Sequence, residues 1–160
     1  MGKPHVVTLR VTRDRDLDAL FAFGQHEEAV RMAAFTAPDP TDRATFDARW
    51  RRLLADPGVD ARTVRADGEI VGSVARWFDD DVAEITYWID PAHWGEGIAT
   101  RAMRLFLDVM PDRPVRARVA ADNAGSIAVL EKLGFRRAGS AMSFANARGT
   151  EIEELVYRLA

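Results

Sequence analysis

The segment HWGEGIATRAMRLFLDVM, residues 93–110, places two glycines immediately before a stretch with the apolar spacing of a helix. Gly95 and Gly97 flank Glu96, and the small residues Ala99 and Thr100 follow. The start of a helix exposes unpaired backbone N–H groups and about half a unit of positive charge, and glycines let a large anion approach that backbone closely. The segment therefore predicts either a backbone site for a phosphate group or a tight strand-to-helix turn without a ligand.

The residues on both sides of this segment predict a mixed α/β sheet. Runs of β-branched and aromatic residues predict strands, and the turn at residues 67–68 predicts a hairpin. The strand, glycine turn, helix and strand between residues 82 and 120 require a right-handed crossover between parallel strands. The predicted strands cover residues 5–12, 61–66, 69–78, 82–89, 115–120, about 135–144 and 151–159. The first predicted helix is 16–35, with an interruption at Gly24, and the second begins at Thr41 and carries Phe46, Trp50, Leu53 and Leu54 on one face. The third follows the glycine turn and is expected to bury Ile98, Ala102, Leu105, Phe106 and Val109. The fourth runs from Asp122 or Asn123 to Gly134.

Length, charge and composition predict one domain over residues 1–160 and narrow the class of protein. The chain has no cysteine, so neither a disulfide nor a thiolate site is expected. A net charge of −3 argues against a nucleic-acid partner. No apolar run approaches the ~18 residues of a membrane span, and the first ten residues lack the apolar stretch of a secretion signal, so a cytoplasmic protein without a membrane partner is predicted. The sequence leaves the oligomeric state open, a homodimer included.

Two common phosphate-binding motifs do not fit the glycine turn. A P-loop needs a lysine within the turn, and the chain has lysine only at residues 3 and 132. A dinucleotide-binding turn follows the first strand and carries a third glycine, whereas Thr100 occupies that position here and a hairpin precedes the motif. A different kind of phosphate site, or none, is left.

Two motifs together resemble the GNAT superfamily of acyl-CoA-dependent N-acyltransferases. The first is the glycine turn from Trp94 to Ala99, and the second is NAGSIAVLEKLGF, residues 123–135. The resemblance implies a mostly antiparallel mixed sheet that opens between its central parallel strands and is flanked by helices. It also implies direct transfer of an acetyl group from acetyl-CoA to a primary amine, either a protein N-terminus or a small molecule. Trp94 departs from the glutamine or arginine usual at the start of the family's glycine turn. Leu130 stands where many members carry a tyrosine that acts as general acid. Both departures, with Ser126, resemble the branch that acetylates the N-termini of ribosomal proteins.

The resemblance assigns cofactor-binding roles to residues on both sides of the turn. The pyrophosphate of coenzyme A would bind backbone N–H groups of the turn, and the pantetheine arm would pair with the preceding strand. Asn123 either contacts the same arm or caps its helix, and Arg101 either adds a phosphate contact or is a solvated helix charge. The side chain of Glu96 is expected to face solvent. The candidate residues are Tyr87, Trp88, Ile89, Trp94, Gly95, Glu96, Gly97, Ile98, Ala99, Thr100, Asn123 and Ser126.

The chemistry of amine acetylation needs a proton acceptor and a stabilised leaving thiolate. An alkylammonium has a pKa near 10.4 and must lose a proton before it attacks, for which a carboxylate is suited. Glu84 lies within an apolar strand and is the first candidate, with a salt bridge to Arg76 or Arg118 as the structural alternative. Ser126 can donate a hydrogen bond to the thiolate, or it is an ordinary serine of a first helical turn. Glu153 and Glu154 are second candidates near a cationic acceptor, and His26 is a candidate for lining the acceptor cleft.

The sequence leaves a non-catalytic alternative and predicts no metal. Because Leu130 replaces the tyrosine, an acyl-CoA-binding or sensor module on the same fold is the rival function. His5 and His93 have no acidic or histidine partner at ligand spacing in the sequence, so no metal site is expected. Acetyl-CoA is the only cofactor predicted, as a co-substrate.

Overall fold

A seven-stranded sheet in the order β1-β2-β3-β4-β5-β7-β6 organises the chain. The computed structural model describes residues 5–160. All neighbouring strands are antiparallel except β4 and β5, which are parallel. The strands are β1 Val7–Val11, β2 Asp60–Ala66, β3 Glu69–Asp79, β4 Val82–Ile89, β5 Val115–Ala120, β6 Arg136–Ala145 and β7 Thr150–Leu159. This confirms the predicted mixed, mostly antiparallel α/β fold.

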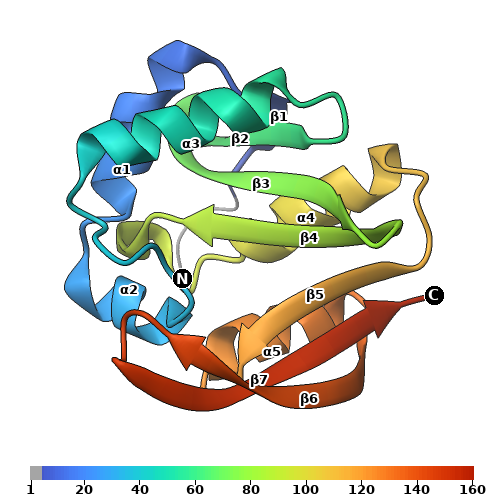
Figure 1. Ribbon diagram of the computed structural model, residues 1–160. Helices are drawn as coiled ribbons and strands as arrows, with labels where there is room; N and C mark the ends of the chain where they lie inside the picture. The colour runs from blue at the N-terminus through green and yellow to red at the C-terminus, as the bar shows by residue number, and fades with distance from the viewer. Residues whose placement is uncertain (1–4) are drawn as a thin grey trace.

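Within residues 5–160, five α-helices cover the two faces of this sheet. In Figure 1, α4 and α5 lie behind the sheet, and α1 and α3 lie on the side toward the viewer. The helices are α1 Leu17–Phe23, α2 Glu27–Ala33, α3 Arg43–Ala55, α4 Ile98–Val109 and α5 Ala124–Lys132, with single 3₁₀ turns η1 Asp14–Asp16 and η2 Pro91–His93. The predicted interruption of helix 16–35 occurs at Gly24, which ends α1. No helix in the described part of the chain combines the length and apolarity needed to cross a membrane.

The parallel strands β4 and β5 are paired over only two positions. Ala83 lies opposite Val115 and Glu84 opposite Arg116, whereas β3 and β4 are paired along the whole of β4. Figure 1 shows β5 turning away from β4 toward the carboxyl ends of both strands. The sheet therefore opens between its central strands, on the side where β4 leads into the glycine turn and α4.

Helix α4 is the main helix of the core, and its buried stripe agrees with the predicted one at Ile98, Ala102 and Phe106 but not at Leu105 and Val109. Met103 and Leu107 are buried with Ile98, Ala102 and Phe106, whereas Leu105 and Val109 are 40% and 59% exposed. The prediction for Leu105 and Val109 was wrong because α4 carries apolar residues on more than one face, and only packing against the sheet selects the buried one. Helix α3 is only half-buried along its predicted face.

A buried carboxylate joins the first helix to the sheet. Asp16 is 1% exposed and accepts two hydrogen bonds from Arg10, at 2.6 and 2.7 Å. The backbone N–H of Arg13 and the hydroxyl of Thr63 each donate to it at 2.9 Å. Burial alone would raise the pKa of Asp16, but these hydrogen bonds outweigh burial and lower the pKa to about 2. The start of α1 is thereby fixed to β1 and β2.

The Asp16 network predicts a stability loss that depends on pH. Asp16→Asn should lower the free energy of unfolding by about 2 kcal/mol at neutral pH. The folded-state pKa of about 2 lies below the unfolded-state pKa of about 3.9, and this difference stabilises the folded protein once the pH exceeds the unfolded-state pKa. The difference from wild type should shrink as pH falls from about 5 toward 2, where the wild-type carboxylate takes up its proton. Urea unfolding across this pH range measures both effects. Asp18→Asn is the matched control, since the Asp18 side chain is 88% exposed; an equal loss in both variants would contradict the assignment.

Candidate functional site

The glycine turn at the start of α4 leaves its backbone uncovered. Gly95 and Gly97 have φ angles of 80° and 77°, in the left-handed region that favours glycine. A Cβ built on either residue would meet no atom within 4 Å, and no side chain caps α4 at Gly97. The first N–H groups of α4 are thus presented at an open surface, as an anion site requires.

The end of β4 lies between a tight contact with β3 and a free edge toward β5. A Cβ on Gly72 of β3 would lie 2.1 Å from the carbonyl oxygen of Trp88 and 2.9 Å from a side-chain carbon of Ile89. On the other edge, the described residues of β5 pair with β4 only as far as Glu84. The indole of Trp94 donates to the carbonyl of Ile89 at 3.0 Å and holds the turn against the strand. Residues 85–89 therefore offer a strand edge without a strand partner.

Two residues predicted to contact the cofactor meet across this opening. The hydroxyls of Tyr87 on β4 and Ser126 on α5 are 2.9 Å apart. Burial raises the pKa of Tyr87, and the hydrogen bond with Ser126 acts in the opposite direction. The phenol is therefore protonated near neutral pH and can donate a hydrogen bond. A cofactor contact was predicted for each of the two residues, but their separation of 39 positions in the chain carried no signal of the contact between them.

Asn123 acts as the cap of α5. Its Oδ1 accepts the backbone N–H of Ser126 at 3.2 Å. Of the two roles predicted for Asn123, the structure contains the helix cap, and this cap uses the side-chain oxygen. The side-chain NH₂ group is left for any contact with a ligand.

Glu84 is buried and ion-paired at the point where β4 and β5 separate. Its side chain is 3% exposed, contacts Nε of Arg116, and lies 3.4 Å from Nε of Arg118. Arg118 also approaches Glu154 of β7, at 3.7 Å. Of the two predicted salt-bridge partners, Arg118 is present and Arg76 is not, because Arg76 pairs with Asp112 at 2.9 Å. Arg116 was not predicted, since its contact depends on the register of the parallel pair.

Glu84 and Tyr87 project from opposite faces of β4. Side chains alternate along a strand, so Glu84 shares its face with Trp88 and Tyr87 lies on the other. The indole of Trp88 donates to the carbonyl of Phe23 at the end of α1, at 3.1 Å, while Tyr87 contacts α5. The opening between β4 and β5 is therefore flanked by a carboxylate on one side and two hydroxyls on the other.

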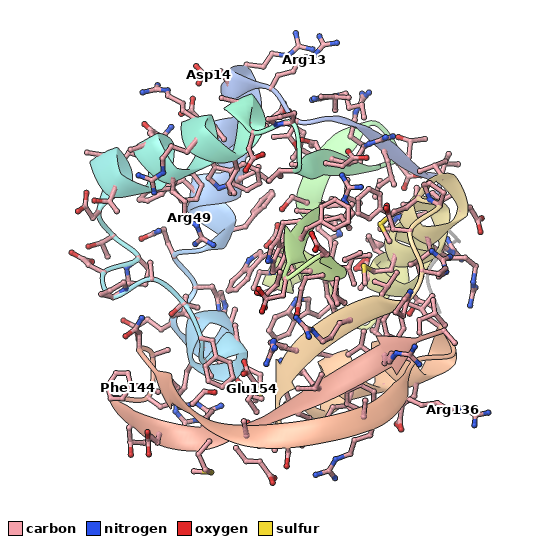
Figure 2. All side chains as sticks on the ribbon, turned by 45° about the vertical axis from the view of Figure 1, so that its right-hand side comes forward. Arg13, Asp14, Arg49, Arg136, Phe144 and Glu154 are labelled. Atoms are coloured by element: carbon pink, nitrogen blue, oxygen red, sulfur yellow. The ribbon has the colours of Figure 1, made fainter. Side chains whose placement is uncertain are left out.

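The second candidates occupy different surroundings. Glu154 is 9% exposed and accepts a hydrogen bond from Ser143 at 3.2 Å. Figure 2 shows Glu154 on the inner side of β7, with Phe144 and Arg136 at the periphery. Glu153 is exposed, and its carboxylate lies 4.0 Å from the guanidinium of Arg137. His26 accepts the N–H of Ala29 at 3.4 Å and caps α2.

The expectation that His5 and His93 lack a partner was wrong. Nε2 of His5 lies 2.6 Å from Glu96, and Nδ1 of His93 lies 3.3 Å from the same carboxylate oxygen. Nδ1 of His5 lies 2.6 Å from Asp67 in the turn between β2 and β3. The hydrogen bond with Asp67, followed by the one with Glu96, raises the pKa of His5. Glu96 is exposed as predicted, but its carboxylate is engaged.

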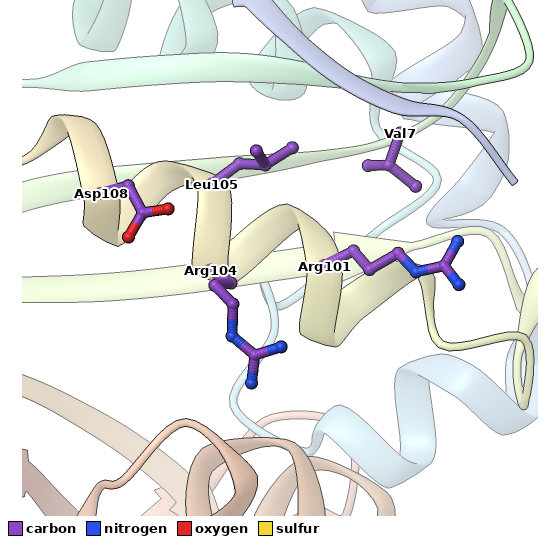
Figure 3. A pocket seen from close by; sticks show the side chains of 5 residues that line it. All are labelled: Val7, Arg101, Arg104, Leu105 and Asp108. Atoms are coloured by element: carbon purple, nitrogen blue, oxygen red, sulfur yellow. The ribbon is translucent and has the colours of Figure 1, made fainter.

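A pocket beside α4 lies next to this group of side chains. It is lined by Val7, Arg101, Arg104, Leu105 and Asp108. Figure 3 shows Val7 and Leu105 above the helix axis, the side chain of Arg104 extending down and away from them, and that of Arg101 running to the right below Val7. Arg101 donates to the backbone carbonyl of His5 at 2.7 Å, so neither predicted alternative, phosphate contact or solvated charge, describes it fully.

Comparison with known proteins places this geometry in a family. Residues 7–136 match the family model described as an acetyltransferase (GNAT) domain. The N-alpha-acetyltransferase RimI of Mycobacterium tuberculosis is 30% identical over 124 residues, which cover 73% of this chain and 75% of that protein. The L-amino acid N-acetyltransferase AaaT of Escherichia coli is 26% identical over 158 residues, covering 92% and 93%. The structure of Mycobacterium smegmatis RimJ in complex with CoA-disulfide superposes with a TM-score of 0.79 at 25% identity, covering 96% of this chain and 81% of that one.

Proposed function

The chain belongs to the acetyltransferase (GNAT) family, and from that premise we propose that it transfers an acetyl group from acetyl-CoA directly to a primary amine. The observation that carries the proposal is the free edge of β4, which lies between an uncovered glycine turn and the Tyr87–Ser126 hydroxyl pair. The acceptor is a polypeptide N-terminus or a small-molecule amine, in keeping with two relatives, the N-alpha-acetyltransferase RimI and the L-amino acid N-acetyltransferase AaaT.

The glycine turn fits the pyrophosphate of coenzyme A. The backbone of residues 94–100 would donate to it, because Gly95 and Gly97 place no side chain over the start of α4. Side chains contribute less here: Ile98 is buried in the core, and Glu96 bonds the two histidines. The free edge from Tyr87 to Ile89 would pair with the amides of the pantetheine arm, and the NH₂ group of Asn123 is available to the same arm.

The two faces of the opening divide the proton chemistry. Acetyl-CoA, when bound, supplies the acetyl group as a thioester with a thiolate leaving group of pKa near 8.5. That thiolate needs only a hydrogen bond, which the hydroxyl of Ser126 would donate. The hydroxyl of Tyr87 would in turn donate to Ser126, so that it orients the serine and can return a proton to it. This hydroxyl pair takes the place of the tyrosine that Leu130 replaces.

Glu84 is the proposed proton acceptor on the opposite face. It is a buried carboxylate at the last paired position before the strands separate, and one of its oxygens carries the contacts with both arginines. The second oxygen would receive the ammonium proton, directly or through a water molecule. Arg116 and Arg118 hold the carboxylate in place through their contacts with its other oxygen.

A thiol-release assay tests the function, and a matched pair of glycine variants tests the site. The full chain should release free thiol from acetyl-CoA in the presence of a peptide, L-amino acid or polyamine from a panel. Gly97→Val should weaken coenzyme A binding at least tenfold, about 1.4 kcal/mol, in calorimetry. Gly149→Val, at a φ of 65° with equally open surroundings, carries the same backbone strain and should leave affinity unchanged. Binding without thiol release across the panel would favour the non-catalytic module, and equal effects of both variants would exclude the pyrophosphate role.

The hydroxyl pair predicts a loss of turnover with little loss of binding. Ser126→Ala should lower kcat by about tenfold while the KM for acetyl-CoA changes less than twofold, because the hydroxyl matters as charge develops on sulfur. Tyr87→Phe should give a smaller loss in the same direction, and the double variant should be no worse than Ser126→Ala. Additive losses in the double variant, or unchanged turnover with a lower Tm, would contradict the paired role.

The Glu84 assignment predicts a characteristic pH profile. Glu84→Gln should lower kcat by roughly two to four orders of magnitude, and the loss should shrink as pH rises and more acceptor amine is already deprotonated. Glu69→Gln, at the start of β3, is the control, since Glu69 is exposed and has no proposed role in the reaction. If Glu84 serves only as an ion-pair partner of the arginines, the variant will have a lower Tm and a pH–rate profile parallel to that of the wild type.

A further inference from the structure

Two segments that are distant in the chain bring metal-ligating groups together beside the glycine turn. His5 precedes β1, His93 ends η2, and Glu96 lies between the two glycines. One ligand atom from each, Nε2 of His5, Nδ1 of His93 and Oε1 of Glu96, lies within 4.8 Å of the others. We call these three residues the histidine cluster.

The donor set of the histidine cluster is the one that zinc-like cations prefer. Two imidazole nitrogens and one carboxylate oxygen bind Zn²⁺ at about 2.0–2.2 Å, and in catalytic-type sites water completes the coordination. Tetrahedral bonds of that length place neighbouring ligand atoms about 3.3 Å apart. The separation of His93 from Glu96 is already 3.3 Å, and the 2.6 Å separation of His5 from Glu96 needs only a small opening of an exposed glutamate.

A fourth residue orients His5 as a ligand. Asp67 lies 2.6 Å from Nδ1 of His5, and its other oxygen accepts the backbone N–H of Val6 at 2.9 Å. A carboxylate that takes the proton-bearing nitrogen of a histidine directs the lone pair of the other nitrogen outward, which is the usual support for a metal-bound histidine. The carboxylates of Glu96 and Asp67 together also match the charge of a divalent cation. The arrangement therefore supplies both the ligands and an anchored support behind one of them.

We propose that His5, His93 and Glu96 bind a divalent cation of the zinc class, with Asp67 as the positioning residue. The cation would tie the segment before β1 and the turn after β2 to the glycine turn. It lies outside the proton chemistry of Glu84, Tyr87 and Ser126, and acetyl transfer in the proposed function needs no metal. The proposal therefore stands or falls on metal binding alone.

Titration of the full chain, prepared without an oligohistidine tag, with Zn²⁺ tests the site. Calorimetry should give one ion per chain, and Co²⁺ should produce the visible absorption bands of a tetrahedral site. His93→Ala and His5→Ala should each weaken Zn²⁺ binding at least tenfold, and Asp67→Asn should weaken it by about 10- to 100-fold. His26→Ala removes the third histidine of the chain, which lies outside the cluster, and should leave binding unchanged.

Melting curves of each variant in the presence of a chelator show whether the variant is folded without metal, so that lost Zn²⁺ binding can be told apart from unfolding. His93→Ala removes the 3.3 Å contact with Glu96 and an edge contact with the ring of His5 but leaves the bonds of His5 with Asp67 and Glu96, so it tests the ligand role even if His5→Ala unfolds the chain. Absence of saturable Zn²⁺ binding would overturn the proposal and leave the cluster as an ion pair of His5 with two carboxylates. Binding that survives His93→Ala, or that His26→Ala weakens equally, would also overturn it.

Discussion

The two halves of the sheet meet in a parallel pairing that is only two residue pairs long. The proposed site depends on this pairing being short. Strands β1 to β4 form one half, and β5, β7 and β6 form the other. At the junction the ladder is short, and the buried Glu84 contacts Arg116 across it. One continuous core contains buried residues of α4 and of both halves, and this core supplies the cohesion that the missing ladder does not. A longer parallel ladder would join the halves more firmly and would close the edge that the proposed site uses.

The short junction also explains why the polar groups of the site are separated. A strand presents alternate side chains to its two faces, so a reaction between β4 and β5 has access to both. Glu84 lies on the face of α1, and Tyr87 and Ser126 lie on the face of α5. An acceptor amine and a leaving sulfur can therefore be served from opposite sides without competing for one group. The arginines around Glu84 have a structural role as well, since a lone carboxylate buried at this depth would be costly.

Local signals in the sequence were sufficient for most of the fold. Strands 82–89 and 115–120 were predicted with the bounds that the structure has, because β-branched residues and flanking turn residues mark both ends. The two glycines were predicted to shape the turn, and both have positive φ angles. The buried stripe of α4 was predicted incorrectly at Leu105 and Val109, since apolar residues on several faces leave the choice to tertiary packing.

Contacts between distant segments were beyond the reach of the sequence. His5 is 62 residues from Asp67 and 91 residues from Glu96, and no periodicity relates such positions. Arg116 could not be chosen over Arg76 because the choice depends on strand register. The catalytic roles of Glu84 and Ser126 stay predictions, since their surroundings fit the proposed chemistry without testing it.

The glycine at position 72 gives the opening an unexpected point of control. β4 approaches β3 so closely at Trp88 that only a hydrogen atom fits on the β3 side, while on its other edge the end of β4 has no pairing with β5. A single methyl group at residue 72 would displace β4 toward the very gap that the proposed cofactor arm occupies. The width of the site is thus encoded on the opposite edge of β4, in a residue that no ligand would touch. A survey of sequence variation confined to ligand-lining positions would overlook Gly72. A designer who wished to change the width of the gap would begin by substituting this residue.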